Sequence, residues 1–372
     1  MKSKHTAALC LSLLTAFGMT LSPQTNRPDL IASADLRGDA DGSGTLDAAD
    51  AVRLRDYLIC ETAELNAAGA NLDGNGKISA VDLTLLKRIL IQNGQQQTTA
   101  PSAYMSQVRA SYVTELPQLA QGGGTMNHIS YFSKKANKEK PANVWLPPDY
   151  NPSEQYPVFY VNHGIQGNEY TMLGDFKILE SATTLIASGE AVPMIIVFTF
   201  MYTNPNKDNC DGITADEVTY YDAFLDDLTD SLMPYIESNY SCKTGRENTA
   251  IGGFSMGGRE SLYIGIMRPD LFGYIAASSP APGVVPARDH FMEHVGSISE
   301  DQFRMSEPYL PYLLMIAGGT ADGMVGDFPE QYHKLFEKNG TDHIWISVPG
   351  GGHDGGVGAP LFYNFIRALF QA

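Results

Sequence analysis

Residues Thr249-Ala-Ile-Gly252 run into Gly253-Phe-Ser-Met-Gly257, and this stretch decides the fold. The first four residues have the short, apolar character of a buried strand, and a helical pattern over Arg259–Met267 follows the motif. A G-x-S-x-G motif between a strand and a helix predicts a sharp turn that holds its serine at the carboxyl end of the strand. Ser255 is therefore the candidate nucleophile. A plain tight turn between strand and helix is the alternative interpretation.

A base and an acid for this serine follow later in the chain, each directly after an apolar run. His353 ends the stretch Pro349-Gly-Gly-Gly-His353 and is the predicted base, because a loop so rich in glycine adds no packing and instead positions a side chain. Asp322 follows the preceding apolar run and is the predicted acid that orients the imidazole, with Asp327 as the alternative. The order serine, aspartate, histidine, with both partners after the last strands, resembles the α/β-hydrolase arrangement.

Two backbone N–H groups are expected to bind the oxyanion that forms when a serine attacks a carbonyl group. Met256 follows the serine at the start of the predicted helix, where unpaired N–H groups favour negative charge. His163-Gly-Ile165 follows an earlier apolar run, and Ile165 is the predicted second donor. A plain turn at His163-Gly164 is the alternative interpretation.

Alternating apolar runs and helical patterns over residues 104–372 predict an α/β domain. The runs are short, apolar on both faces and bounded by Gly or Pro, which is typical of buried parallel strands. Ile129–Ser133 and Asn143–Leu146 are predicted to form an antiparallel edge of a doubly wound, mostly parallel sheet. The other predicted strands are Val158–Asn162, Met194–Phe200, Thr249–Gly252, Tyr274–Ala277, Leu313–Ala317 and Ile344–Val348, and the predicted helices include Ala223–Ser238, Glu330–Lys338 and Pro360–Phe370.

A separate duplication lies near the N-terminus, where Asp39–Asp50 aligns with Asn71–Asp82. Each copy has oxygen-bearing side chains at loop positions 1, 3, 5 and 12 and glycine at position 6, the spacing of an EF-hand-type calcium loop. Two loops in register, each followed by an apolar helical pattern, favour Ca²⁺ binding over a chance acidic turn. The predicted ligands are Asp39, Asp41, Ser43, Thr45 and Asp50 in the first copy and Asn71, Asp73, Asn75, Lys77 and Asp82 in the second, with Thr45 and Lys77 contributing backbone carbonyls.

The duplicated segment resembles the dockerin family, type I in character, whose modules attach plant-polysaccharide enzymes to cohesin domains of a scaffold protein. The resemblance covers residues 35–93 and implies a small all-α domain with structural Ca²⁺ and a cohesin partner. Loop positions 10 and 11 hold Ala48-Ala49 and Ala80-Val81 where well-known dockerins have Ser-Thr, which favours a more apolar cohesin contact. Residues 94–103 are polar and aperiodic, and we predict a flexible linker there.

The N-terminus predicts the location of the protein, and the net charge bears on its partners. Residues 1–34 are predicted to be a signal peptide, because a basic start and an apolar run precede the small residues Ala32 and Ala34. An earlier cleavage directly after the apolar run is the alternative. No later stretch is long and apolar enough for a transmembrane helix, so a secreted protein with no membrane partner is expected. The formal net charge of −17 argues against nucleic acid as a partner.

Cysteine usage leaves one question open. Cys210 and Cys242 remain in the large domain, and an oxidising compartment would allow them to form a disulfide bond. Buried free thiols are the alternative, since their spacing matches no metal site.

The large domain also resembles carbohydrate esterase family one, the feruloyl and acetylxylan esterases of plant-cell-wall degraders. The resemblance implies a serine esterase that removes feruloyl groups from xylan side chains through an acyl-enzyme, with Ser255, Asp322 and His353 as its triad and no cofactor for catalysis. The matching stretches are Ala142–Tyr150, Tyr156–Gly164, Leu232–Tyr240, Gly253–Gly258 and Gly350–Asp354.

Three alternatives to feruloyl hydrolysis stay open at this point: an acetylxylan esterase, a non-catalytic carbohydrate-binding protein carried on a scaffold, and an acyltransferase that uses the same relay. Feruloyl hydrolysis requires a long slot, whereas acetyl hydrolysis requires a small pocket. The candidate walls of that pocket are the loops Gln166–Gly174 and Asn204–Asp216, and Tyr202, Pro282 and Met324 are candidates to flank an aromatic ring. Phe254 directly precedes the serine.

Overall fold

The computed structural model describes residues 37–43, 46, 48–60, 65–72, 75–87 and 103–372. The chain divides into two compact units, Met1–Leu90 and Ile91–Ala372. The predicted signal peptide 1–34 and most of the predicted linker 94–103 lie outside the described residues. No helix among the described residues is long and apolar enough to cross a membrane.

The first unit is helical and built on the duplication. Its helices are α1 (Ala48–Cys60), the short α2 (Ala67–Ala70) and a helical segment over residues 80–87. The hydrogen bonds from Gly38 N to Gly69 O and from Asn66 N to Ala40 O, 2.9 and 3.0 Å long, join the two halves. Equivalent apolar residues of the two copies therefore meet in one small core, which contains Ala40, Leu54, Ala70, Leu72 and Leu86.

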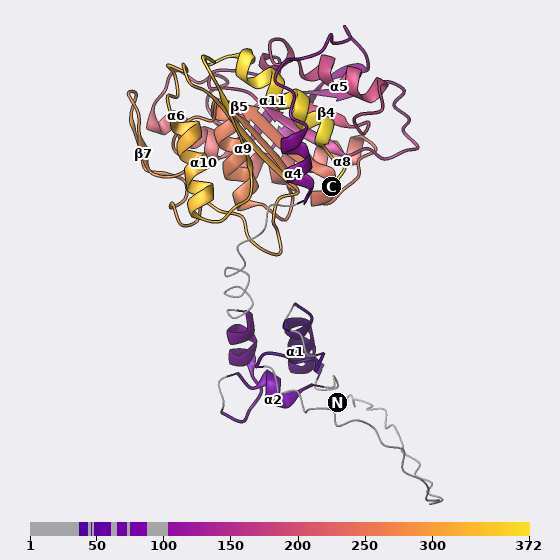
Figure 1. The fold of residues 1–372 in the computed structure, drawn as a ribbon, viewed down its shortest axis with the longest axis vertical. Helices are drawn as coiled ribbons and strands as arrows, with labels where there is room; N and C mark the ends of the chain where they lie inside the picture. Colours follow the sequence, from indigo (N-terminus) through magenta and orange to yellow (C-terminus); the bar gives the residue numbers. More distant parts are fainter. Residues whose placement is uncertain (1–36, 44–45, 47, 61–64, 73–74, 88–102) are drawn as a thin grey trace, which may run out of the picture. The chain divides into compact units, whose positions relative to one another are not determined.

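The second unit is organised around an eight-stranded sheet (Figure 1). The order is β1-β2-β4-β3-β5-β6-β9-β10, with antiparallel pairing at β1-β2 and β2-β4 and parallel pairing elsewhere. The predicted mostly parallel sheet with an antiparallel edge is therefore confirmed. The strands are β1 (Thr125–Ser133), β2 (Lys138–Leu146), β3 (Val158–Asn162), β4 (Ile195–Phe198), β5 (Thr249–Phe254), β6 (Tyr274–Ser278), β9 (Leu313–Gly319) and β10 (Ile344–Val348), and a separate hairpin pairs β7 (Ala287–Arg288) with β8 (Glu293–His294).

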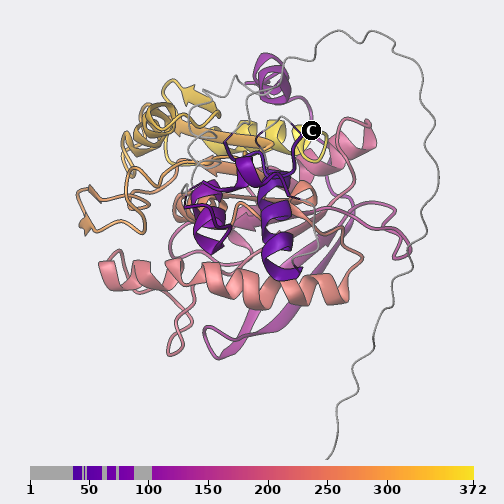
Figure 2. The ribbon, with the colours of Figure 1, turned by 90° about the horizontal axis from the view of Figure 1, so that it is seen from below.

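Helices cover both faces of this sheet, as Figures 1 and 2 show. Side chains of β3 alternate between the two resulting cores: Val158 and Tyr160 pack in one, Phe159 and Val161 in the other. Because both faces are buried, the strands are continuously apolar. The helical segments are α4 (Ala103–Ala110), η1 (Thr171–Leu173), α5 (Ile178–Ala187), α6 (Ala215–Asp222), α7 (Phe224–Asp227), the π-helix η2 (Leu228–Leu232), α8 (Met233–Asn239), η3 (Arg246–Asn248), α9 (Met256–Met267), α10 (Phe328–Lys338) and α11 (Gly355–Ala368).

Two details differ from the sequence-based expectations. The helix expected over Ala223–Ser238 contains the π-helical turn η2, and α5 and α6 were not predicted. The open question about the cysteines has an answer: Cys210 and Cys242 are buried free thiols and form no disulfide bond.

A buried ion pair joins β2 to α7. Lys140 Nζ lies 2.6 Å from Asp227 Oδ2, and both side chains are fully buried. The same carboxylate oxygen accepts a hydrogen bond from the Tyr131 hydroxyl at 2.8 Å, and Lys140 also donates to Thr203 Oγ1 at 2.8 Å. Burial lowers the pKa of Lys140 to about 8, against the attraction of Asp227.

We expect Lys140→Met to lower the free energy of unfolding by about 3–5 kcal/mol, because it leaves the Asp227 carboxylate buried without its counter-charge. Lys135→Met is the matched control, since Lys135 pairs with the neighbouring Asp226 while both side chains are about half exposed. We expect Lys135→Met to lower the free energy of unfolding by about 0–1 kcal/mol. Urea unfolding of both variants measures the difference, and equal stabilities would contradict this account of the pair.

Candidate active site

The serine of the G-x-S-x-G motif sits on a strained turn between β5 and α9. Ser255 has φ 57° and ψ −117°, a conformation that residues other than glycine rarely adopt. Its backbone N–H donates to Ser278 O at 2.9 Å, which ties the turn to the end of β6. A Cβ at Gly253 or Gly257 would lie 2.6 or 2.3 Å from Asn162 O, so both glycines are required by close backbone contact. The expected strand–turn–helix is therefore present.

The structure brings Ser255, His353 and Asp322 together in one hydrogen-bonded chain. His353 Nε2 lies 2.9 Å from Ser255 Oγ, and His353 Nδ1 lies 2.8 Å from Asp322 Oδ2. Because an ionised carboxylate only accepts hydrogen bonds, Nδ1 carries the proton and Nε2 presents its lone pair to the serine hydroxyl. These three hydrogen-bonded side chains can move a proton from the serine hydroxyl to the imidazole.

Backbone groups fix the aspartate, and a ring packs against the histidine. The second oxygen of Asp322 accepts hydrogen bonds from Met324 N and Val325 N at 2.9 and 3.1 Å. The ring of Phe254, one residue before the serine, packs on the ring of His353 with centroids 4.5 Å apart. Each member of the chain is thus held by its own loop, which favours a preorganised site.

The alternative acid lies elsewhere. Asp327 precedes α10, is exposed, and accepts a hydrogen bond from Gln331 Nε2 at 2.9 Å. Asp354, next to the histidine, accepts from Gly356 N at 2.8 Å at the start of α11. Of these three aspartates, Asp322 is the one whose carboxylate contacts His353.

The two predicted oxyanion donors lie beside the serine. Met256 is the first residue of α9, and Ile165 follows β3 in the loop next to the turn. Both residues line the same pocket as Ser255. A Cβ added to the neighbouring Gly164 would lie 3.5 Å from Ser255 Cβ, so the two loops are in contact. No hydrogen bond within the described part of the chain uses either backbone N–H, so both groups are free to bind an oxyanion.

The side chain of His163 fixes the loop that carries Ile165 through two hydrogen bonds. The sequence did not indicate this role. Its Nε2 accepts a hydrogen bond from Met201 N at 3.1 Å, so Nδ1 carries the proton and donates to Gly164 O at 2.6 Å. Burial lowers the pKa of His163 to about 4, which keeps the ring neutral and this tautomer fixed. The hydrogen bond that defines the role comes from a residue far along the chain, and sequence spacing carries no sign of it.

A mostly apolar pocket opens at the serine. Met324 and Pro282, predicted as candidate walls, line it, and Ile213 contributes from the predicted loop Asn204–Asp216. The prediction was wrong for Tyr202, which is buried and donates a hydrogen bond to Glu217. The loop Gln166–Gly174 contributes no residue to this lining. The lining residues are Ile165, Ile213, Val218, Ser255, Met256, Ala281, Pro282, Asp289, Phe291, His294, Met324 and Val325.

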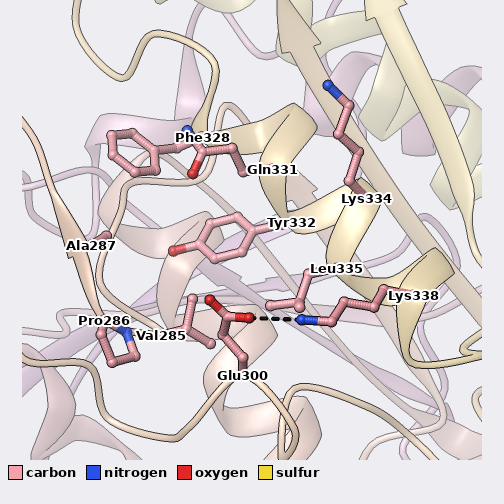
Figure 3. Close-up of a pocket in the computed structure, with 10 residues that line it drawn as sticks. All are labelled: Val285, Pro286, Ala287, Glu300, Phe328, Gln331, Tyr332, Lys334, Leu335 and Lys338. Carbon is pink, nitrogen blue, oxygen red and sulfur yellow. Dashed lines mark hydrogen bonds and ion pairs between the residues drawn. The ribbon is translucent and has the colours of Figure 1, made fainter.

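A second hollow lies between α10 and the segment before the β7–β8 hairpin (Figure 3). Tyr332 projects into the middle of the view, and the ion pair between Glu300 and Lys338, 2.9 Å long, closes one side. None of its ten lining residues is a serine, cysteine or histidine. This hollow therefore lacks a serine–histidine pair, which the pocket at Ser255 has.

The first predicted calcium loop gathers carboxylates. Asp39, Asp41 and Asp50 each offer an oxygen, and these oxygens lie within 4.8 Å of one another. Asp50 Oδ1 also accepts a hydrogen bond from Ala40 N at 2.8 Å, which closes the loop. Ser43 N donates to Asp39 and Asp41 within this loop. The donor set is all oxygen, as Ca²⁺ prefers.

The second loop repeats the hydrogen bond to the aspartate at position 12. Asp82, the equivalent of Asp50, is buried and accepts from Leu72 N at 2.8 Å. Asn71 Oδ1 is buried with no hydrogen-bond partner in the part of the chain that the structure describes, as expected of a ligand atom. Lys77 N donates to Asn75 Oδ1 at 2.7 Å. The other two predicted ligands, Thr45 in the first loop and Asp73 in the second, lie outside the described residues.

The putative esterase family matches residues 133–359, which include the serine, the aspartate and the histidine. The chain belongs to the esterase family. The dockerin type I domain family matches residues 37–95, so the chain joins an N-terminal dockerin domain to an esterase domain.

Several known proteins are similar to this chain. A carbohydrate esterase family one ferulic acid esterase from Anaeromyces mucronatus, solved with ferulic acid, is 40% identical with a TM-score of 0.65, and the match covers 74% of this chain and 97% of that one. The endo-1,4-beta-xylanase/feruloyl esterase of Xylanibacter ruminicola is 35% identical over 157 residues, which are 41% of this chain and 21% of the relative. Endo-1,4-beta-xylanase Y of Acetivibrio thermocellus is 29% identical over 196 residues, 50% and 17% respectively. The chain thus spans about a fifth of the length of these two curated relatives.

Proposed function

We propose that the esterase domain is a serine feruloyl esterase that releases hydroxycinnamate from xylan side chains. The observation that carries this proposal is the hydrogen-bonded chain from Ser255 through His353 to Asp322 at the mouth of an apolar pocket. A ferulic acid esterase 40% identical over most of the domain supports the choice of acyl group.

The proposed reaction begins with attack of Ser255 Oγ on the ester carbonyl carbon, while His353 Nε2 accepts the hydroxyl proton. The backbone N–H groups of Met256 and Ile165 bind the oxyanion of the tetrahedral intermediate. The bond to the sugar oxygen then breaks, and the sugar hydroxyl leaves with the proton that His353 returns.

Water completes the cycle by attacking the acyl-enzyme, with His353 again accepting the proton. The bond between the acyl group and Ser255 breaks, the serine regains its hydrogen, and the hydroxycinnamate is released. Asp322 stabilises the imidazolium form of His353 in both halves of the reaction.

The choice between feruloyl and acetyl hydrolysis is tested by initial rates on methyl ferulate and on acetylated xylan. We expect the higher kcat/KM on the feruloyl ester, because the pocket at Ser255 is mostly apolar and a ferulic acid esterase is 40% identical to this chain. Release of acetate without release of ferulate would contradict the proposal and would indicate an acetylxylan esterase. Failure of a fluorophosphonate to label Ser255 would instead favour a binding protein.

We also propose that the dockerin domain binds Ca²⁺ in both loops and attaches the enzyme to a cohesin domain outside the cell. Asp39, Asp41, Ser43, Thr45 and Asp50 would hold one ion, and Asn71, Asp73, Asn75, Lys77 and Asp82 the other. The cluster of carboxylates in the first loop and the unpartnered Asn71 oxygen in the second support this proposal. Cleavage of residues 1–34 as a signal peptide would export the chain.

Removing one charge at loop position 12 should remove one bound Ca²⁺. We expect Asp50→Asn and Asp82→Asn each to lose the ion of its own loop, because the amide oxygen can still accept from Ala40 N or Leu72 N but the charge that Ca²⁺ requires is gone. Asp56→Asn is the control, since Asp56 is on α1 and pairs with Arg55. Isothermal titration calorimetry measures the stoichiometry.

Chelation provides the complementary measurement. With EDTA, cohesin binding should be lost while hydrolysis of methyl ferulate is retained, because the ions belong to the dockerin domain. Unchanged stoichiometry in both loop variants, or hydrolysis lost on chelation, would contradict the proposed role of Ca²⁺.

A further inference from the structure

The loop after β3 is anchored on both sides of Ile165. Before this residue, Gly164 O accepts a hydrogen bond from His163 Nδ1 at 2.6 Å. After it, the backbone N–H of Gln166 donates to the hydroxyl of Tyr221 at 2.9 Å. Ile165 therefore lies between two fixed backbone groups, while its own N–H is used by no hydrogen bond in the described part of the chain.

The geometry of the peptide group makes these anchors matter to an oxyanion. Gly164 O and Ile165 N–H belong to one trans peptide group, so they point to opposite sides of its C–N bond. Contacts that fix this peptide group therefore also fix the direction of the N–H. Ile165 lines the pocket at Ser255, where a well-directed N–H stabilises the negative oxygen of the tetrahedral intermediate.

The anchor after Ile165 holds an unfavourable backbone conformation. Gln166 has φ 61°, in the left-handed region that residues other than glycine rarely adopt. Its side chain is exposed, so packing of that side chain contributes little to holding the conformation. The hydrogen bond from its backbone N–H to Tyr221 offsets the strain, as surrounding structure must do wherever such a conformation persists.

Buried contacts hold Tyr221 in place. It lies on α6 and is fully buried, and its ring packs edge-on against the ring of His163 with centroids 6.5 Å apart. The ring of Tyr202 also packs on it, with centroids 5.5 Å apart. Burial raises the pKa of Tyr221, so its hydroxyl stays protonated and neutral. The hydroxyl is therefore a fixed acceptor for the N–H of Gln166.

We propose that Tyr221 is a positioning residue of the oxyanion hole, whose hydroxyl holds Gln166 in the left-handed conformation and so directs the N–H of Ile165 at the oxyanion. This inference rests on the proposed serine esterase function and deepens it. Tyr221 is not among the residues that line the pocket at Ser255, so it acts through the loop and not on the ester. Because the oxyanion forms only as the reaction proceeds, the effect belongs to kcat and not to KM.

Tyr221→Phe removes the hydroxyl and keeps the buried ring. We expect it to lower kcat on methyl ferulate and on p-nitrophenyl acetate by about tenfold, which is below the loss of about 10²–10³-fold that follows from deleting an oxyanion donor outright. KM for each ester should stay within about twofold of the wild-type value. Tyr220→Phe, at a half-buried tyrosine of the same helix, is the control and should keep the wild-type kcat.

A second change separates positioning of the loop from general destabilisation. Glycine adopts positive φ without steric cost, so Gln166→Gly combined with Tyr221→Phe should restore kcat to within about threefold of the wild-type value. Affinity for a boronic acid, which forms a tetrahedral anionic adduct with an active-site serine, should fall in Tyr221→Phe and recover in the double variant. Wild-type kcat in Tyr221→Phe, or a loss that Gln166→Gly does not reverse, would overturn the proposal.

The two esters keep this inference separate from the proposed function. If the wild-type protein hydrolyses p-nitrophenyl acetate but no feruloyl ester, the proposed acyl group is wrong, and a tenfold loss on the acetate still supports the role of Tyr221. If both esters are hydrolysed equally well by the wild-type protein and by Tyr221→Phe, the role of Tyr221 is wrong and the esterase function stands.

Discussion

Ser255→Ala is expected to reduce kcat on methyl ferulate by about 10⁵-fold or more, because it removes the atom that attacks the ester. The fold should persist, since the Oγ hydrogen bond to His353 is the one side-chain hydrogen bond that the structure shows for this serine among the described residues. Steady-state hydrolysis and the midpoint of thermal unfolding measure the two effects separately.

A buried serine nearby offers a control for this variant. Ser278 ends β6, and its hydroxyl has no hydrogen-bond partner in the described part of the chain. Ser278→Ala should therefore leave kcat within a few-fold of the wild-type value. A near-normal kcat in Ser255→Ala would show that Ser255 is not the nucleophile.

Asp322→Asn is expected to reduce kcat by about 10⁴-fold while KM changes little. The asparagine oxygen can still accept from Met324 N and Val325 N, so the loop is retained. Its amide N–H, however, would donate to His353 Nδ1, which moves the ring proton to Nε2 and removes the lone pair that the serine needs.

Asp327→Asn is the matched comparison, because the same change is made five residues later at a carboxylate that contacts Gln331 and not the histidine. We expect its kcat to stay close to the wild-type value. A larger loss of kcat in Asp327→Asn than in Asp322→Asn would mean that Asp327, and not Asp322, is the acid of the triad.

The sheet and the three polar residues of the site were readable from the sequence for a physical reason. Buried parallel strands are continuously apolar, and each candidate residue stands directly after one of them, at the carboxyl edge where active sites of open sheets form. Ser255, Asp322 and His353 thus converge because β5, β9 and β10 end at one edge of the sheet.

What the sequence did not reveal depends on contacts between distant or very short elements. Helix α5 was missed because Glu180 is its one charged residue, so no charged stripe marks it as an amphipathic helix. The β7 and β8 strands are two residues long, too short to show a period, so the hairpin that contributes Asp289 and His294 to the pocket was not anticipated. The role of His163 depends on Met201 N, which only the folded sheet brings to it.

The central claim is that Ser255 carries the feruloyl group during turnover. Mixing the protein with methyl ferulate, stopping the reaction with acid within the first turnover and digesting the product tests it by mass spectrometry. We predict one feruloyl group on the peptide that contains Ser255, and none in Ser255→Ala. Turnover of the ester with no adduct on this peptide, or with the adduct on another residue, would contradict the account.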